Sequence, residues 1–150
     1  MVDSAFYLTA ALETDFPAIK ALIHETGINP MSLDWHRFCV AKTADGDQFI
    51  GCGQLKPHGD GTVELASIAV ASAWRKKGVA SAIMQKLMAE GPRPLYLTCR
   101  SSMGPFYEKF SFHPVPTEAL PKYFRRLNKL AGLINALHLV NERVLIMQLD

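Results

Sequence analysis

The segment from Leu65 to Glu90 constrains the fold of this chain more than any other. It begins with an apolar run at 65–70, passes through a basic, glycine-containing turn at 75–80, and continues with helical periodicity up to Gly91. A further apolar run follows at 95–99. Because a full helix separates the two apolar runs, the pattern predicts two parallel strands joined by a right-handed crossover.

The turn has the sequence Arg75-Lys76-Lys77-Gly78-Val79-Ala80 and favours an anion. Gly78 and Ala80 leave the backbone bare where it enters the helix, so N–H groups at the positive end of the helix dipole can point outward beside three cations. A pyrophosphate is the ligand that fits best. The alternative is an ordinary solvated turn, since three fixed positions also occur at unrelated helix starts.

Three segments together resemble the GNAT superfamily of N-acetyltransferases. Arg75-x-x-Gly78-x-Ala80 is similar to its R/Q-x-x-G-x-G/A signature, and Glu64 lies eleven residues earlier, where many members keep a catalytic carboxylate. The segment 106–112 is similar to its F/L-Y-x-K-x-G-F pattern, with Ser111 in place of glycine. The resemblance covers roughly the middle third of the chain.

This resemblance implies an α/β (α+β) fold, with a mostly antiparallel mixed sheet, a central splayed parallel strand pair and flanking helices. It also implies acetyl-CoA as co-substrate and no metal. The pantetheine arm would pair with the backbone of the strand before the loop, and the pyrophosphate would sit on the loop. The implied cofactor-binding residues are Ile68, Ala69, Val70, Arg75, Lys76, Lys77, Gly78, Val79 and Ala80.

Two side chains are candidates for proton transfer. Glu64 shares a predicted strand face with Ala66, Ile68 and Val70, and the resemblance implies that it accepts the proton of the acceptor ammonium. Tyr107 stands where the superfamily commonly has a tyrosine that protonates the leaving thiolate. The competing interpretations for Glu64 are an exposed strand carboxylate or a salt bridge to a basic neighbour. The competing interpretation for Tyr107 is a tyrosine packed on the core.

Composition narrows the class of protein. The 150 residues suit a single domain, expected to span 1–150, and a net charge of +2 argues against nucleic acid or a charged membrane surface as the partner. Cys39, Cys52 and Cys99 lie in apolar runs without metal-ligand spacing, which indicates core residues in a reducing compartment. With no signal-like start or membrane-length run, we expect a cytoplasmic protein.

The remaining elements follow from periodicity and turn residues. We expect a helix over 15–26 with Thr14 as N-cap and Gly27 as its end, a hairpin of strands 38–42 and 49–55, and a short helix beginning near Pro105. We also expect a helix over 121–141, continuous or broken at Gly132, and a closing strand over 144–149. The apolar stripe of the late helix is Leu127, Leu130, Leu133, Ile134 and Leu137.

The acceptor amine is the least constrained part of the prediction. Segments 64–70, 112–115 and 118–121 resemble the acetyltransferase domains that make N-acetylglutamate and related amino-acid acetyltransferases. An amino acid needs a cation for its carboxylate, which Arg125, Arg126 or Lys129 could supply unless they form a solvated face. Arg100 is a further candidate contact with CoA or substrate, and the apolar stripe could pack internally or in a homodimer.

Four other functions make different demands on these residues. A CoA-binding regulatory module would keep the loop without needing Glu64 or Tyr107, and an enzyme acting on a protein or peptide amine would keep all three. A nucleic-acid surface at 123–126 has too small an electrostatic footprint on a nearly neutral chain. A dinucleotide site at 51–53 fails because the segment continues as a strand.

Overall fold

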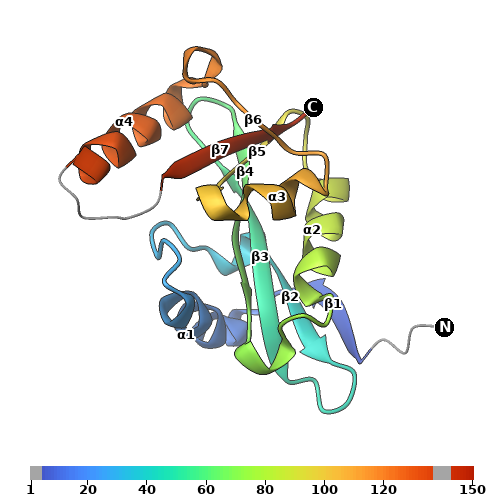
Figure 1. Ribbon diagram of the computed structural model, residues 1–150. Coiled ribbons are helices and arrows are strands. Elements are labelled where there is room, and N and C mark those ends of the chain that lie inside the picture. The colour runs from blue at the N-terminus through green and yellow to red at the C-terminus, as the bar shows by residue number, and fades with distance from the viewer. Residues whose placement is uncertain (1–4, 137–142) are drawn as a thin grey trace. The chain divides into compact units, whose positions relative to one another are not determined.

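The computed structural model describes residues 5–136 and 143–150, which form a mixed sheet flanked by helices (Figure 1). The predicted α/β class is confirmed. In these residues seven strands follow the order β1-β2-β3-β4-β5-β7-β6. The strands are β1 (Phe6–Ala10), β2 (Phe38–Thr43), β3 (Phe49–Pro57), β4 (Val63–Val70), β5 (Leu95–Arg100), β6 (His113–Pro114) and β7 (Val144–Leu149). The α-helices in the same ranges are α1 (Phe16–Thr26), α2 (Val79–Glu90), α3 (Gly104–Glu108) and α4 (Lys122–Ala136).

The predicted parallel pair is present. Strand β4 pairs with β5 in parallel, and the register places Glu64 opposite Tyr96. The pairs β1–β2, β2–β3, β5–β7 and β6–β7 are antiparallel. Helix α2 lies between the two parallel strands in the sequence. It forms a helix because its residues are mostly strong helix formers, with no internal glycine or proline.

The chain divides into two compact units. The first unit comprises Met1–Lys56 and Leu65–Gly91, and the second comprises Pro57–Glu64 and Pro92–Asp150. The prediction of a single domain over 1–150 stays a prediction. The division assigns the predicted anion loop to the first unit and both candidate proton-transfer residues to the second.

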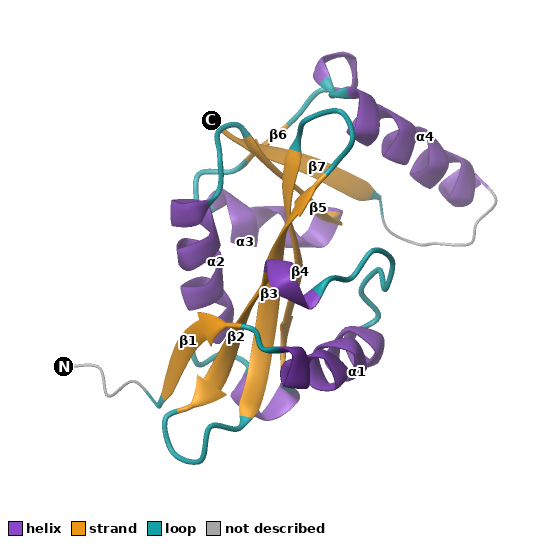
Figure 2. Cartoon of the chain, turned by 180° about the vertical axis from the view of Figure 1, so that it is seen from behind, coloured by secondary structure: helices purple, strands orange, loops and turns teal. Residues whose placement is uncertain are grey.

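In the first unit, α1 and α2 lie on opposite sides of strands β1–β3 (Figure 2). Ile19 and Ile23 of α1 are fully buried in one cluster with Val40 and Cys52. On the other side Gly53 must lack a side chain, since an added Cβ would lie 2.7 Å from Ile83 of α2. The 51–53 segment is therefore a packing surface for α2.

The start of α1 differs from the prediction. Residues Glu13–Asp15 form a 3₁₀ turn, so Thr14 does not cap the helix. The Asp15 carboxylate instead accepts a hydrogen bond from the Leu12 N–H at 2.8 Å, which holds the preceding turn. The predicted end is confirmed, because Gly27 has a φ of 73° that favours glycine.

In the second unit, α3 and α4 pack on opposite faces of β5 and β7. Tyr96 and Ile146 belong to the cluster that also contains Phe124 of α4. Cys99 and Leu145 are opposite each other, one position beyond the pair Thr98–Ile146, so their side chains point to the other face of the sheet. On that face an added Cβ on Gly104 of α3 would lie 3.0 Å from Leu145.

Helix α4 continues through Gly132 without a break, and the predicted residues 137–141 lie outside the described residues. Phe124 is fully buried, and Leu127 packs against the same cluster. Leu130 and Leu133 are 56% and 59% exposed, so the predicted apolar stripe is not a buried face along its length. In the described part of the chain, no helix is long and apolar enough to cross a membrane.

Asp60, in the turn between β3 and β4, accepts a hydrogen bond from the first turn of α4, which is 63 positions later in the sequence. The Tyr123 N–H, in the first turn of α4, donates to Asp60 Oδ2 at 2.9 Å. The other oxygen, Oδ1, accepts from the N–H and hydroxyl of Thr62 at 3.0 and 2.6 Å. Desolvation alone would raise the pKa of Asp60, but the hydrogen bonds from Thr62 and Tyr123 outweigh it and lower the pKa to about 2.

We expect Asp60→Ala to destabilise the protein by about 1 kcal/mol at neutral pH, as loss of a helix cap does. Because the pKa is lowered in the folded state, the ionised carboxylate stabilises the fold above the ordinary value of 3.8, and this contribution disappears as the pH falls towards 2. Thermal unfolding from pH 2 to 7 checks this. The two melting temperatures should converge at low pH, and a constant difference would contradict the capping role.

Candidate active site

The predicted anion loop leads into α2 through a glycine with positive φ. Gly78 is the N-cap of α2 with a φ of 84°, and it provides no side-chain cap. The first intrahelical bond is donated by Ala82 to the Gly78 carbonyl, so the N–H groups of Val79, Ala80 and Ser81 have no partner within the helix. An added Cβ on Gly78 would meet no atom within 4 Å. Space for a ligand therefore lies beside these donors.

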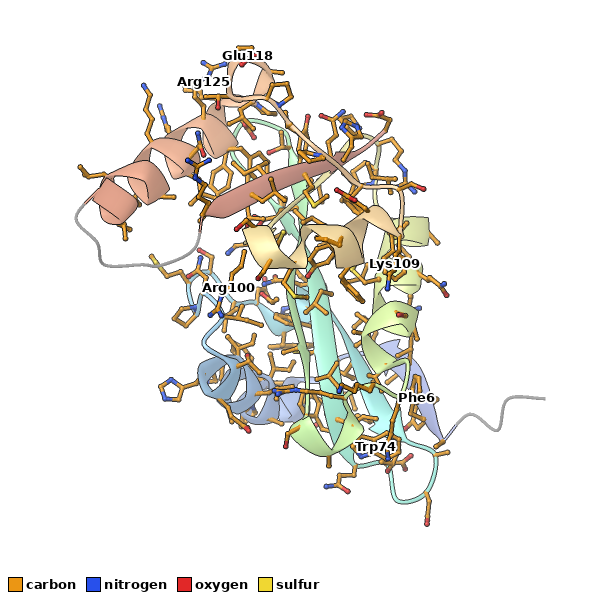
Figure 3. The ribbon with its side chains drawn as sticks, in the orientation of Figure 1. Phe6, Trp74, Arg100, Lys109, Glu118 and Arg125 are labelled. Carbon is orange, nitrogen blue, oxygen red and sulfur yellow. The ribbon has the colours of Figure 1, made fainter. Side chains whose placement is uncertain are left out.

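The cations of the loop differ in their contacts. Arg75 Nε donates to the Val70 carbonyl at 3.2 Å, which ties the loop to the end of β4. The Lys77 ammonium lies 5.1 Å from the ring centre of Trp74, which stands on the loop before α2 (Figure 3). Lys76 has a φ of 62°, so the chain turns sharply there. The Val70 carbonyl, one of the backbone groups predicted to contact pantetheine, therefore already accepts a hydrogen bond from Arg75.

Strand β4 is irregular at its centre. Ser67 has a φ of 60°, which interrupts the predicted alternation of Glu64, Ala66, Ile68 and Val70 along one face. Its hydroxyl accepts from Gln54 Nε2 at 2.8 Å. Simple alternation is therefore wrong beyond Ala66, because a left-handed residue turns the following side chains.

Glu64 is held by two neighbours within the second unit. Its Oε1 lies 2.8 Å from His58 Nε2, and its Oε2 accepts from the Thr98 hydroxyl at 3.0 Å. The His58 and Glu64 side chains are only 7% and 8% exposed. The His58 ring stacks on Tyr123 with centroids 3.5 Å apart. Glu64 is thus a buried, oriented carboxylate rather than an exposed strand residue.

Tyr107 lies on α3 with a half-buried side chain. Burial, with a smaller effect from nearby Cys99, raises its pKa to about 12. The phenol therefore keeps its proton at neutral pH and can donate it. In the described residues no protein group forms a hydrogen bond with its hydroxyl, while Phe106 packs against its ring at 5.1 Å between centroids.

Glu64 and Tyr107 approach β5 from opposite faces. Glu64 bonds Thr98, whose register partner Ile146 belongs to the cluster beneath α4. Tyr107 belongs to α3, on the face of Cys99. The two side chains therefore lie on different faces of β5.

A cavity of about 490 Å³ lies between α4 and β7. Apolar groups of Leu120 and Ile146 line it together with the polar residues Asn128 and Arg143. None of the three predicted cations of α4 lines it. Arg125 Nη2 donates to the Leu120 carbonyl at 3.0 Å, near the turn that carries Glu118 (Figure 3), while Arg126 and Lys129 are exposed.

The cysteines are poor nucleophiles. Burial raises the pKa of Cys39, Cys52 and Cys99 to about 11, 12 and 11, so each stays a thiol at neutral pH. Among residues 5–136 and 143–150, no group of three or more His, Cys, Asp or Glu side chains is placed to hold a metal ion.

Comparison with known families identifies the chain. The model of the acetyltransferase (GNAT) family matches residues 6–112, from the first strand to the end of the Tyr107 segment. The chain belongs to the GNAT acetyltransferase family. No match was found among curated protein sequences.

Solved GNAT structures share the fold. N-acetylglutamate synthase from Neisseria gonorrhoeae, complexed with coenzyme A and N-acetyl-glutamate, matches with a TM-score of 0.73 and 19% identity over 97% of this chain, which spans 35% of that one. Rv2747 from Mycobacterium tuberculosis, in complex with CoA, matches with a TM-score of 0.70 and 20% sequence identity. This match covers 96% of this chain and 99% of Rv2747. The ribosomal-protein-S18-alanine N-acetyltransferase from Escherichia coli matches with a TM-score of 0.62 and 18% sequence identity. This match covers 96% of this chain and 92% of the Escherichia coli enzyme.

Sequence reasoning missed three residues beside Glu64: His58, Thr98 and Tyr123. The turn before β4 gave a usable signal for His58, since a histidine six positions before a carboxylate can return to it across a tight hairpin. Thr98 and Tyr123 lie 34 and 59 positions beyond Glu64, and no local pattern links them to it.

Proposed function

We propose that this GNAT protein transfers the acetyl group of acetyl-CoA to the primary amine of a small molecule, with an amino acid as the favoured acceptor. The observation that carries the proposal is the combination of family membership with a buried, oriented Glu64 carboxylate. Reaction occurs by direct attack of the amine in a ternary complex, for which positioning of both substrates supplies much of the rate.

The donor side fits a pyrophosphate. The uncapped N–H groups at the start of α2, the open space beside Gly78 and the adjacent cations suit two phosphates. Pairing of pantetheine with the backbone of Ile68 and Ala69 is the other part of the proposal. When bound, acetyl-CoA supplies an acetyl group activated as a thioester. Glu64 takes a proton from the acceptor ammonium, and Tyr107 Oη gives one to the departing sulfur.

The cavity beneath α4 supports a carboxylate-bearing acceptor. Ile146, whose strand partner Thr98 bonds Glu64, lines this cavity together with Arg143. We assign the acceptor carboxylate to Arg143, since its guanidinium suits such a group and Arg125 already donates to a backbone carbonyl. The complexes of N-acetylglutamate synthase agree with an amino-acid acceptor.

Release of free CoA from acetyl-CoA tests this function across amino acids, their amides, polyamines, aminoglycosides and peptides. We expect amino acids to exceed their amides, and Arg143→Ala to raise the acceptor KM about ten- to a hundredfold. Arg126→Ala and Lys129→Ala are matched controls on α4. Equal use of the amides, or preference for polyamines or peptides, would exclude the amino-acid assignment.

A change at Gly78 tests the donor side. Gly78→Glu places a carboxylate beside the uncapped N–H groups, so we expect acetyl-CoA affinity to fall by about ten- to a hundredfold through loss of charge-assisted contacts. Calorimetry measures the affinity. Gly78→Ala is the control: it carries the strain of a positive φ without added charge, and its Cβ meets no atom, so it should keep most of the affinity.

A further inference from the structure

His58 is the closest titratable neighbour of Glu64, and the β3–β4 turn holds it there. Its Nε2 lies 2.8 Å from Glu64 Oε1. The His58 N–H donates to the Thr62 carbonyl at 2.9 Å, and the Gly61 N–H returns to the His58 carbonyl at 3.0 Å. These backbone bonds close a tight hairpin, so the position of His58 relative to the start of β4 is set by the main chain.

The imidazole ring is also held by α4. Tyr123 stacks almost parallel to it, with 12° between the planes, and Phe124 meets it edge-on at 5.7 Å. The same Tyr123 is tied through its N–H to Asp60 of the turn. A ring with stacking and edge contacts inside a buried cluster has little freedom to rotate. Its Nε2 is therefore directed at Glu64.

The chemistry of the two groups determines the direction of the hydrogen bond. An ionised carboxylate only accepts, so His58 Nε2 is the donor whenever Glu64 is ionised. Thr98 donates to the second oxygen. Each carboxylate oxygen accepts one of these bonds and retains another lone pair, which leaves Glu64 able to take a further proton.

We propose that His58 is a positioning residue that holds Glu64 oriented for proton abstraction from the acceptor ammonium. This inference rests on the proposed role of Glu64. In the step, an N–H bond of the ammonium breaks and an O–H bond forms on Glu64, so one positive and one negative charge are neutralised together. His58 keeps its contact with Oε1 and takes no part in the proton transfer.

This arrangement predicts which kinetic constant depends on His58. The titratable groups that face His58 are Glu64 of β4, Asp60 of its own turn and Tyr123 of α4. Without the donor at Nε2, the Glu64 carboxylate keeps only the hydrogen bond from Thr98 and is held less firmly in position. The value of kcat should therefore fall when His58 is replaced by an apolar residue, while the KM for acetyl-CoA stays the same.

The experiment compares His58→Leu and His58→Gln with wild type from pH 5 to 9, using whichever amine the wild type acetylates. We expect His58→Leu to lower kcat about tenfold, with an unchanged KM for acetyl-CoA. His58→Gln keeps a hydrogen-bond donor and should lose less activity. His113→Leu is the matched control, because His113 forms an exposed pair with Asp150 at 3.1 Å in the same unit.

A wild-type kcat in His58→Leu, or an equal loss of kcat in both variants, would overturn the proposal. Nitrogen-15 NMR of the histidine rings adds a readout that needs no turnover and no variant. The Nε2–H tautomer of His58 at neutral pH supports the proposal, and the Nδ1–H tautomer contradicts it. If the wild type acetylates no amine, the proposed function fails, and the NMR spectrum still decides whether His58 donates to Glu64.

Discussion

Replacing Glu64 by glutamine should lower kcat/KM by about 10²–10⁴-fold, the range typical of a lost general base. Glutamine keeps the shape of the buried side chain but cannot take a proton at the position held by His58 and Thr98. The loss should be greatest at acidic pH, where the acceptor amine is most fully protonated. Steady-state rates from pH 5 to 9 give this dependence.

The matched control is Glu118→Gln, which removes an exposed carboxylate from the same unit and should keep the wild-type rate. Acetyl-CoA affinity should be unchanged in both variants, since the loop at the start of α2 is intact. A wild-type rate in Glu64→Gln across the whole pH range would remove the base assignment and leave positioning as the source of catalysis.

Tyr107→Phe should lower kcat by about 10²–10⁴-fold if its hydroxyl protonates the departing sulfur, with little change in the affinity for acetyl-CoA. Phenylalanine keeps the ring that packs on Phe106, so the change removes only the hydroxyl. A pKa of about 12 keeps the acid form present below that pH. Ionisation of Tyr107 should therefore cause no loss of wild-type activity below about pH 11.

Single-turnover measurements separate this chemical step from product release. Tyr7→Phe is the control, because it removes an exposed hydroxyl that donates to Asp47 in the first unit. A fall in acetyl-CoA affinity that accounts for the whole effect of Tyr107→Phe would make Tyr107 a binding residue. An undiminished kcat would leave the sulfur to be protonated by solvent.

Much of the fold could be predicted from local patterns. The turn sequence 45–47 sets the hairpin between β2 and β3, and the positive φ of Gly46 and Asp47 explains why. The predicted helix α2 is confirmed, and it begins directly after Gly78 as expected. Helix periodicity and turn chemistry depend on residues a few positions apart, so they can be read directly from the chain.

The error at Thr14 and the interrupted strand at Ser67 have a different origin. Asp15 bonds back to Leu12, and Ser67 accepts from Gln54 on another strand. In both places a specific side-chain partner outweighs the average preference of the residue. Ser111 is a related case: it takes a φ of 72° where the GNAT pattern has glycine, so the turn after α3 is formed despite the substitution.

Three candidate groups are predicted from the amino-acid sequence alone: an anion loop at a helix start, a carboxylate on the preceding strand and a tyrosine on a short helix. Those groups lie in short segments whose patterns are local. The folded chain adds the burial of Glu64 between His58 and Thr98, the stacking of Tyr123 of α4 on His58, and the place of Arg143 rather than Arg125 in the lining of the cavity. These contacts join residues far apart in the chain, and they form only when burial of apolar surface pays the entropy of bringing them together.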